Sequence, residues 1–261
     1  MRGKGGFNNL IMDAAPIVRL SGVGKRFGQG PAVLTDIGLA AAPGEFISLI
    51  GPSGCGKSTL LRLIAGLMRP SAGEIILGEG AGASSFLVFQ DPNLLPWRRV
   101  SANVELPLLL RGDPAGPRRE RVRAMLELVG LGESAARFPR QLSGGMRMRV
   151  SIARALSVQP RLLLLDEPFG ALDEMTRDRL NEDLLAIRAR DPFTAFFVTH
   201  SVTEAVFLST RIMVLAANPG RITREIPVPF AYPRTPELRE SAAFLELLAE
   251  TSRALRAVSS R

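Results

Sequence analysis

Cysteine, histidine and large aromatic side chains are scarce in this sequence of 261 residues. It contains one cysteine, one histidine, one tryptophan and one tyrosine, and aromatic residues make up 6% of the chain. The single cysteine, Cys55, excludes a disulfide bond within the chain and is typical of a reducing compartment.

Long apolar runs are also missing. The longest are pieces such as LPLLL at 106–110 and LLLL at 162–165, far below the length of a membrane-spanning helix. Near the N-terminus only Leu10–Met12 is apolar, which is too short for the core of a signal peptide. The sequence therefore predicts a soluble, cytoplasmic chain.

What the chain does have is apolar content for a core and an excess of positive charge. Apolar residues make up 46% of it, enough to bury one large core or two small ones, which excludes a disordered or fibrous protein. The net charge of +8 fits an anionic partner such as a nucleotide, a nucleic acid or a lipid headgroup surface. The same charge also fits an ordinary solvated cationic surface.

Strand and helix patterns alternate along most of the chain. Four apolar runs are typical of strands covered on both faces, namely 45–50, 162–166, 194–199 and 211–216. The first run is followed by a helical pattern at 57–68, with apolar side chains at Leu60, Leu61, Ile64 and Leu67. This alternation predicts an α/β fold.

A helical insert interrupts the alternation at about 91–160. Within it, residues 117–130 lie between a proline and a glycine and place Val122, Met125, Leu126 and Val129 on one helix face. Both chain ends differ from the core: residues 1–15 predict a loose tail, and a proline-rich stretch follows Pro227. From Pro236 a final amphipathic helix is expected, with one stripe formed by Leu238, Leu245, Leu248, Ala249 and Leu255.

A glycine-rich loop stands between the first apolar run and its helix. The stretch GPSGCGKST at 51–59 completes the pattern G-x-x-x-x-G-K-[ST] in the strand-to-helix context that this motif requires. Its glycines let backbone N–H groups face phosphate oxygens, and the helix N-terminus adds its positive dipole end. Lys57 would reach the β- and γ-phosphates of a nucleotide, and Ser58 would ligate Mg²⁺. The predicted nucleotide-binding residues are Gly51, Pro52, Ser53, Gly54, Cys55, Gly56, Lys57, Ser58 and Thr59.

Cys55 lies inside this loop. Lys57 and the helix N-terminus both favour a lowered thiol pKa and hence reactivity, whereas the simpler interpretation is a small side chain that fills the loop. In either case, alkylation of Cys55 is expected to block nucleotide binding.

Two carboxylates, Asp166 and Glu167, end the apolar run 162–166. Because ligands of open α/β sheets bind at the carboxyl edge of the strands, this pair is placed for catalysis rather than in an ordinary solvated turn. Asp166 is expected to hold Mg²⁺ through water, and Glu167 to accept a proton from the attacking water.

Gln90, His200 and Asp173 also follow apolar runs or precede a helix. Gln90 would ligate Mg²⁺ or orient water through its amide, and His200, the only histidine, would reach a γ-phosphate. Asp173 is expected to be the N-cap of the helix that follows it, a structural role that is compatible with one at the site.

A second glycine-rich helix start appears in LSGGM at 142–146. Ser143 is a good N-cap, and Gly144 and Gly145 leave the first N–H groups of the helix approachable by an anion. No strand leads into this segment and no lysine follows its glycines. It is therefore an anion-binding helix start rather than a second phosphate loop.

The order of these motifs resembles that of the nucleotide-binding subunit of an ATP-binding cassette (ABC) transporter. The motifs are, in sequence, GPSGCGKST, Gln90, LSGGM, LLLLDEP, GALD and His200. The resemblance covers roughly residues 17–226. It implies a P-loop NTPase fold with a RecA-like core, an antiparallel β edge and a helical ABC subdomain at about 91–160. The domain expected at 16–226 would be flanked by tails at 1–15 and 227–261.

The resemblance also implies partners. Two subunits would pair head to tail and sandwich two ATP with Mg²⁺, so that Ser143, Gly144 and Gly145 contact the ATP held by the partner. Phe27 would stack on adenine, unless it is a core aromatic, and Asp173 would bridge the dimer interface. The segment 94–108 would face a membrane permease, at the cytoplasmic face of the inner membrane. A solute-binding protein would deliver the solute to that permease.

Four shorter stretches, LLPWR, EPFGALD, EAVFLS and NPGRI, look like the importer branch that handles nitrate, sulfonate, taurine or pyrimidine-type solutes. Met148 stands where family members commonly have glutamine, and residues 78–86 form a short loop before Gln90. Neither departure removes a catalytic group.

Two rival functions remain from the sequence. ABC-type ATPases of DNA repair or the ribosome usually have a coiled-coil insertion, zinc cysteines or two cassettes, and this chain has none, so no nucleic acid partner is expected. A non-hydrolytic ATP-sensing regulator would lack the base or the lysine, whereas Glu167 and Lys57 are both present.

Overall fold

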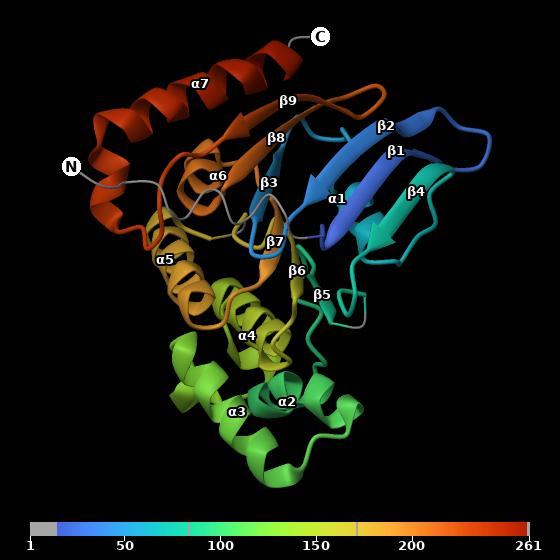
Figure 1. The fold of residues 1–261 in the computed structure, drawn as a ribbon. Coiled ribbons are helices and arrows are strands. Elements are labelled where there is room, and N and C mark those ends of the chain that lie inside the picture. Colours follow the sequence, from blue (N-terminus) through green and yellow to red (C-terminus); the bar gives the residue numbers. More distant parts are fainter. Residues whose placement is uncertain (1–14, 83, 171, 260–261) are drawn as a thin grey trace.

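The computed structural model describes residues 15–82, 84–170 and 172–259. Within these ranges the chain forms two β-sheets with helices packed on their faces and a group of helices at one end (Figure 1). Nearly all of the tail expected at 1–15 lies outside the described residues.

The larger sheet carries the phosphate loop. Its six strands follow the order β5-β6-β7-β3-β8-β9, and all neighbours run parallel except β8 and β9. The bounds are β3 (Phe46–Ile50), β5 (Ser85–Val88), β6 (Leu162–Asp166), β7 (Thr194–Val198), β8 (Arg211–Ala216) and β9 (Arg221–Pro227). Because β3 lies beside β7, and β7 beside β6, the segments that follow these three strands meet at one edge of the sheet.

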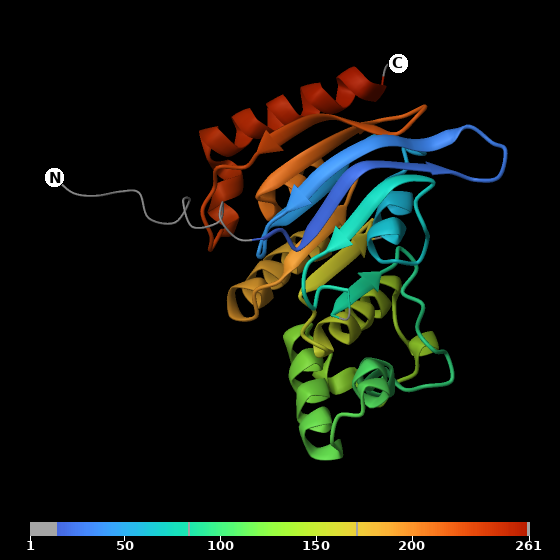
Figure 2. The same cartoon turned by 45° about the vertical axis from the view of Figure 1, so that its right-hand side comes forward.

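The smaller sheet is antiparallel, as expected for the edge of the core. It has the order β2-β1-β4 and consists of β1 (Val18–Arg26), β2 (Ala32–Ala41) and β4 (Ala72–Leu77). Helix α1 (Lys57–Ile64) lies between the two sheets (Figures 1 and 2).

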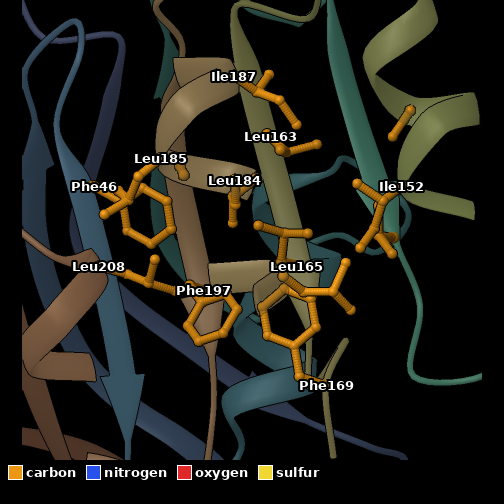
Figure 3. Packing of buried hydrophobic residues seen from close by; sticks show 14 of the residues in the cluster. Phe46, Ile152, Leu163, Leu165, Phe169, Leu184, Leu185, Ile187, Phe197 and Leu208 are labelled. Carbon is orange, nitrogen blue, oxygen red and sulfur yellow. The ribbon is translucent and has the colours of Figure 1, made fainter. Parts of the chain in front are cut away.

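The strands of the larger sheet separate two hydrophobic cores, because successive side chains of a strand point to opposite faces. In β6, Leu162 and Leu164 pack with the small sheet and α1, whereas Leu163 and Leu165 join the core on the helical side. Figure 3 shows this second core, where the ring centroids of Phe46 and Phe197 lie 5.9 Å apart. The runs expected to be covered on both faces are therefore confirmed as strands.

The remaining helices surround this sheet or form the insert. They are α2 (Val100–Arg111), α3 (Ala115–Leu128), α4 (Gly144–Ser157), α5 (Glu174–Arg190), α6 (Val202–Leu208) and α7 (Ala242–Ser259), with 3₁₀ turns at Gly132–Ser134, Pro139–Gln141 and Pro236–Glu240. One expectation was wrong: α1 ends at Ile64, and Leu67 is exposed beyond it because the chain turns at Gly66, which has φ +71°.

The insert is helical, as expected. Val122, Met125 and Leu126 of α3 are buried, and so is Val129 just after the helix, although α3 begins at Ala115 rather than at Pro117. Figures 1 and 2 place α2 and α3 at the end of the molecule opposite α7. Among the described residues no helix combines the length and the apolar character needed to cross a bilayer.

The C-terminal segment packs on the core rather than extending from it. Its α-helix starts at Ala242, after a 3₁₀ turn at Pro236–Glu240, and buries Phe244 and Leu247 in the helical-side core. The expected stripe was wrong in part, because Leu245 and Ala249 are exposed. The face that packs on α6 and β8 is rotated from that stripe.

Arg234 is the main polar anchor of this segment. The residue is 6% exposed, and its guanidinium donates to the carbonyls of Phe207 at 2.7 Å and Ser209 at 2.9 Å. Burial lowers its pKa to about 10. We expect Arg234→Ala to lower the free energy of unfolding by roughly 3 kcal/mol, because buried carbonyls lose a charged donor. Urea unfolding measures this, and Arg253→Ala on the exposed face of α7 should change it by less than about 0.5 kcal/mol. Equal effects of the two variants would contradict the anchoring role.

Candidate functional site

The phosphate loop leaves β3 and curls back into α1. Gly51 needs its lack of a side chain, since an added Cβ would lie 2.5 Å from the Leu215 carbonyl oxygen. Gly56 has φ +95°, and a Cβ there would lie 2.6 Å from Leu34 Cδ2. Glycine at these two positions therefore sets the loop's shape.

Lys57 lies along the inside of the loop. Its side chain is buried, and Nζ donates to the carbonyls of Gly51 at 2.8 Å and Pro52 at 3.1 Å. A cavity of about 370 Å³ opens beside it, lined by Val33, Ser53, Gly54, Gly56, Lys57, Ser58, Thr59, Gln90, Glu167 and His200. The structure thus brings the phosphate loop together with the predicted catalytic residues from three other segments.

Ser58 and Asp166 meet as predicted for a cation site. Ser58 Oγ donates to Asp166 Oδ1 at 2.8 Å, and Asp166 is 4% exposed. Burial raises the pKa of the Asp166 carboxyl, and the Ser58 hydrogen bond opposes that shift. Three oxygen ligands that suit Mg²⁺ lie here, namely the Ser58 hydroxyl, the Asp166 carboxylate and the Gln90 amide oxygen. A nearby positive charge would stabilise the ionised form of Asp166, which burial disfavours.

Glu167 is held between Gln90 and His200. His200 Nε2 lies 2.7 Å from Glu167 Oε1, and Gln90 Nε2 donates to Glu167 Oε2 at 3.4 Å. Glu167 has φ +49°, an uncommon conformation for a residue with a side chain. Such strain is typical of a functional position, and here it accompanies a carboxylate that lines the cavity.

Cys55 differs from the expectation of a lowered thiol pKa. The side chain is fully buried, and burial raises its pKa despite the opposing charge of Lys57, whose Nζ lies 3.8 Å from Sγ. The thiolate is the reactive form, so a raised pKa leaves less of it at neutral pH. Cys55 therefore fills the loop and is not a reactive thiol.

We expect iodoacetamide at pH 7.5 to label Cys55 at least about tenfold more slowly in the folded protein than in urea. Once labelled and refolded, the protein should not bind ATP, because an adduct on Sγ would displace Lys57. Intact-mass spectrometry and equilibrium ATP binding measure both effects, and Cys55→Ser should bind ATP with or without the reagent. Full ATP binding by stoichiometrically labelled protein would contradict this expectation.

The second glycine-rich helix start is confirmed as a capped helix. Ser143 is the N-cap of α4, where its Oγ accepts from the Met146 amide at 3.3 Å. Gly145 lies against Leu172, so that an added Cβ would be 2.8 Å from Leu172 Cδ2. Among the described residues, Ser143, Gly144 and Gly145 are absent from the lining of the phosphate-loop cavity. Met148 is buried in the helical-side core.

Asp173 and Phe27 are both exposed at the surface of the subunit. Asp173 is the N-cap of α5 and accepts from the Thr176 amide at 2.9 Å, a bond that lowers its pKa. Phe27 is 48% exposed, with Lys25 Nζ 5.1 Å from its ring centroid. It is not a core aromatic, and its ring is available for stacking.

Sequence reasoning missed a buried carboxylate near His200, that of Glu204 in α6. Glu204 is 4% exposed, accepts from the Thr199 hydroxyl and lies 3.4 Å from Arg177 Nε, while burial raises its pKa. These residues line a second cavity of about 850 Å³ that also contains Gln90 and Glu167. The available signal was a carboxylate directly before the apolar run AVFL in EAVFLS, a pattern that a solvated helix would not explain.

Comparisons with known proteins identify the family of this chain. Residues 34–170 match the family described as ABC transporter. The taurine import ATP-binding protein TauB of Sinorhizobium fredii is 48% identical over 210 residues, which cover 79% of each chain. An uncharacterized ABC transporter ATP-binding protein of Methanocaldococcus jannaschii is 46% identical over 223 residues, 84% of this chain and 82% of its own.

A solved structure shares the fold. The dimeric structure of a post-hydrolysis state of the ATP-binding cassette MJ0796, bound to ADP and Pi, matches with a TM-score of 0.74 and 35% identity. The match covers 82% of this chain and 100% of that one. The expected P-loop NTPase fold, with its antiparallel sheet and helical parts, is confirmed. By motif order, family match and fold, this chain belongs to the ABC transporter family, as an ATP-binding subunit that hydrolyses ATP.

Proposed function

We propose that this chain energises the import of a small anionic or related solute, of the nitrate, sulfonate or taurine kind. Two copies would sandwich two ATP and work on membrane permease subunits at the cytoplasmic face of the inner membrane. The likeness to TauB supports an importer. The observation that carries the dimer is the likeness to the dimeric structure of the ATP-binding cassette MJ0796, and Ser143 lines neither of the two cavities that contain Glu167.

The residues of that cavity suit phosphoryl transfer to water. Lys57 and the loop amides would hold the β- and γ-phosphates, and Glu167 would take a proton from the attacking water. His200 and Gln90, both in contact with Glu167, would keep its carboxylate oriented toward that water. The partner's helix start would add backbone N–H groups to the charge that develops on the γ-phosphate.

Mg²⁺ would be held by Ser58, Asp166 and Gln90. When bound, it would neutralise charge on the β- and γ-phosphate oxygens, which lowers the cost of the transition state. The bound cation would stabilise the ionised form of the Asp166 carboxyl, which burial disfavours.

The test is reconstitution in lipid vesicles with candidate permease subunits and a candidate solute-binding protein. We expect ATP-dependent accumulation of taurine or another sulfonate, and phosphate release that rises when permease and solute are present. Lys57→Ala should abolish both. Unchanged phosphate release with every permease and solute tried would contradict import, and a salt-sensitive shift of duplex DNA would favour the nucleic acid alternative.

A further inference from the structure

Glu204 in α6 is a buried carboxylate that the catalytic scheme above does not use. One carboxylate oxygen accepts from the Thr199 hydroxyl, and the other lies 3.4 Å from Arg177 Nε. Glu204 is 4% exposed, so these two partners supply most of the polar contacts that its carboxylate makes. A carboxylate so placed is costly to bury, and its contacts hold the groups around it in one arrangement.

The first of those groups is the backbone around His200. Thr199 directly precedes His200, and the same Thr199 hydroxyl that donates to Glu204 accepts from the Ser201 amide at 3.0 Å. Ser201 in turn caps α6 by accepting from the Glu204 amide at 3.3 Å. Both neighbours of His200 are thereby tied to Glu204, whereas the imidazole itself is about half exposed.

The second group is the segment that carries Asp173. Arg177, the other partner of Glu204, donates through Nη2 to the Leu172 carbonyl at 2.9 Å. Leu172 directly precedes Asp173, and it is also the residue against which Gly145 packs. Glu204 thus connects two segments: it contacts Thr199 beside His200, and it contacts Arg177, which donates to Leu172 beside the LSGGM helix.

Helix α6 is in turn fixed at its far end. It has only seven residues, and its C-terminal carbonyls accept from the C-terminal segment. Arg234 donates to Val206, Phe207 and Ser209, and the Tyr232 hydroxyl donates to Leu208. Because these bonds replace the partners that a helix end lacks, α6 has a fixed position from which Glu204 acts.

We propose that Glu204 is a positioning residue that holds His200 against Glu167 by fixing Thr199. Its consequence for turnover rests on the proposed function, whereas its consequence for the imidazole does not. Glu204 acts through the backbone of His200 and does not line the cavity that holds the phosphate loop. Loss of the contact should therefore slow the chemical step and leave ATP binding intact.

The chain offers a matched pair of substitutions for the test. Thr199→Val removes the hydroxyl that donates to Glu204, whereas Thr251→Val removes an equally buried hydroxyl that has no hydrogen-bond partner among the described residues. We expect Thr199→Val to lower kcat at least about fivefold with KM for ATP within about twofold. Thr251→Val should leave both constants unchanged.

A spectroscopic arm does not depend on hydrolysis. His200 is the only histidine, so in protein without an affinity tag the imidazole signals in a ¹H–¹⁵N correlation spectrum belong to it alone. At one fixed pH, these signals should shift or broaden in Thr199→Val and in Glu204→Leu and stay in place in Thr251→Val. Glu204→Leu removes both acceptor oxygens, including the one that accepts from the Thr199 hydroxyl, and serves if Thr199→Val does not fold.

Unchanged imidazole signals in both Thr199→Val and Glu204→Leu would overturn the proposal, as would equal changes in Thr251→Val. If the wild-type protein released no phosphate at all, the proposed function would fail, and the imidazole signals would still decide the role of Glu204.

Discussion

Glu167→Gln should bind ATP with wild-type affinity and lose roughly two to four orders of magnitude in turnover, the usual contribution of a general base. The neutral amide keeps the size of the side chain and can still contact His200 Nε2 and Gln90. It cannot take a proton from water. Equilibrium ATP binding and phosphate release, measured on the same preparation, separate the two effects.

A matched control is Glu246→Gln, which makes the same chemical change on the exposed face of α7. It should leave both measurements at the wild-type value. A Glu167→Gln rate within about threefold of wild type would remove Glu167 from the role of base, because no other property of the amide compensates for a lost proton acceptor. The proton would then have to pass to the phosphate or to another group at the cavity.

The sequence predicted that these side chains would lie together, because they follow strands of one sheet. LLLLDEP and TAFFVTH each end an apolar run, and parallel strands bring their carboxyl ends to one edge whatever the connections between them. The structure accordingly places Glu167 and His200 2.7 Å apart. Local chemistry was equally reliable for helix caps, since Ser143 and Asp173 both accept from an amide three residues on.

Features that depend on tertiary packing were less predictable. The pKa of Cys55 is set by burial, which outweighs the lysine two positions away, and neighbours in sequence say nothing about burial. The stripe expected on the last helix included Leu245 and Ala249, because periodicity alone does not identify the face that meets α6 and β8. The Arg234 contacts join segments about 25 residues apart and leave no local pattern.

Ser143→Arg should abolish ATP-dependent dimerisation and turnover while the isolated subunit still binds ATP. In one chain Ser143 caps α4 and does not line the cavity of Lys57, so its change leaves that cavity intact. In the proposed dimer the arginine would occupy the space needed by the partner's ATP. Light scattering with and without ATP measures dimerisation. Ser143→Ala should cost only about 1 kcal/mol of stability, the usual value of an N-cap, which separates loss of the cap from obstruction.

Mixed dimers decide between a site within one chain and a site shared by two. Pairing a Ser143→Arg chain with a Lys57→Ala chain leaves one site with both groups intact if the site is shared, and none if each chain holds its own. Pairing wild type with a chain that carries both substitutions reverses this outcome, since a shared arrangement then damages both sites. Trapped ATP should therefore be about one per dimer in the first pairing and near zero in the second. The opposite order would show that LSGGM serves the ATP of its own chain and would overturn the shared site.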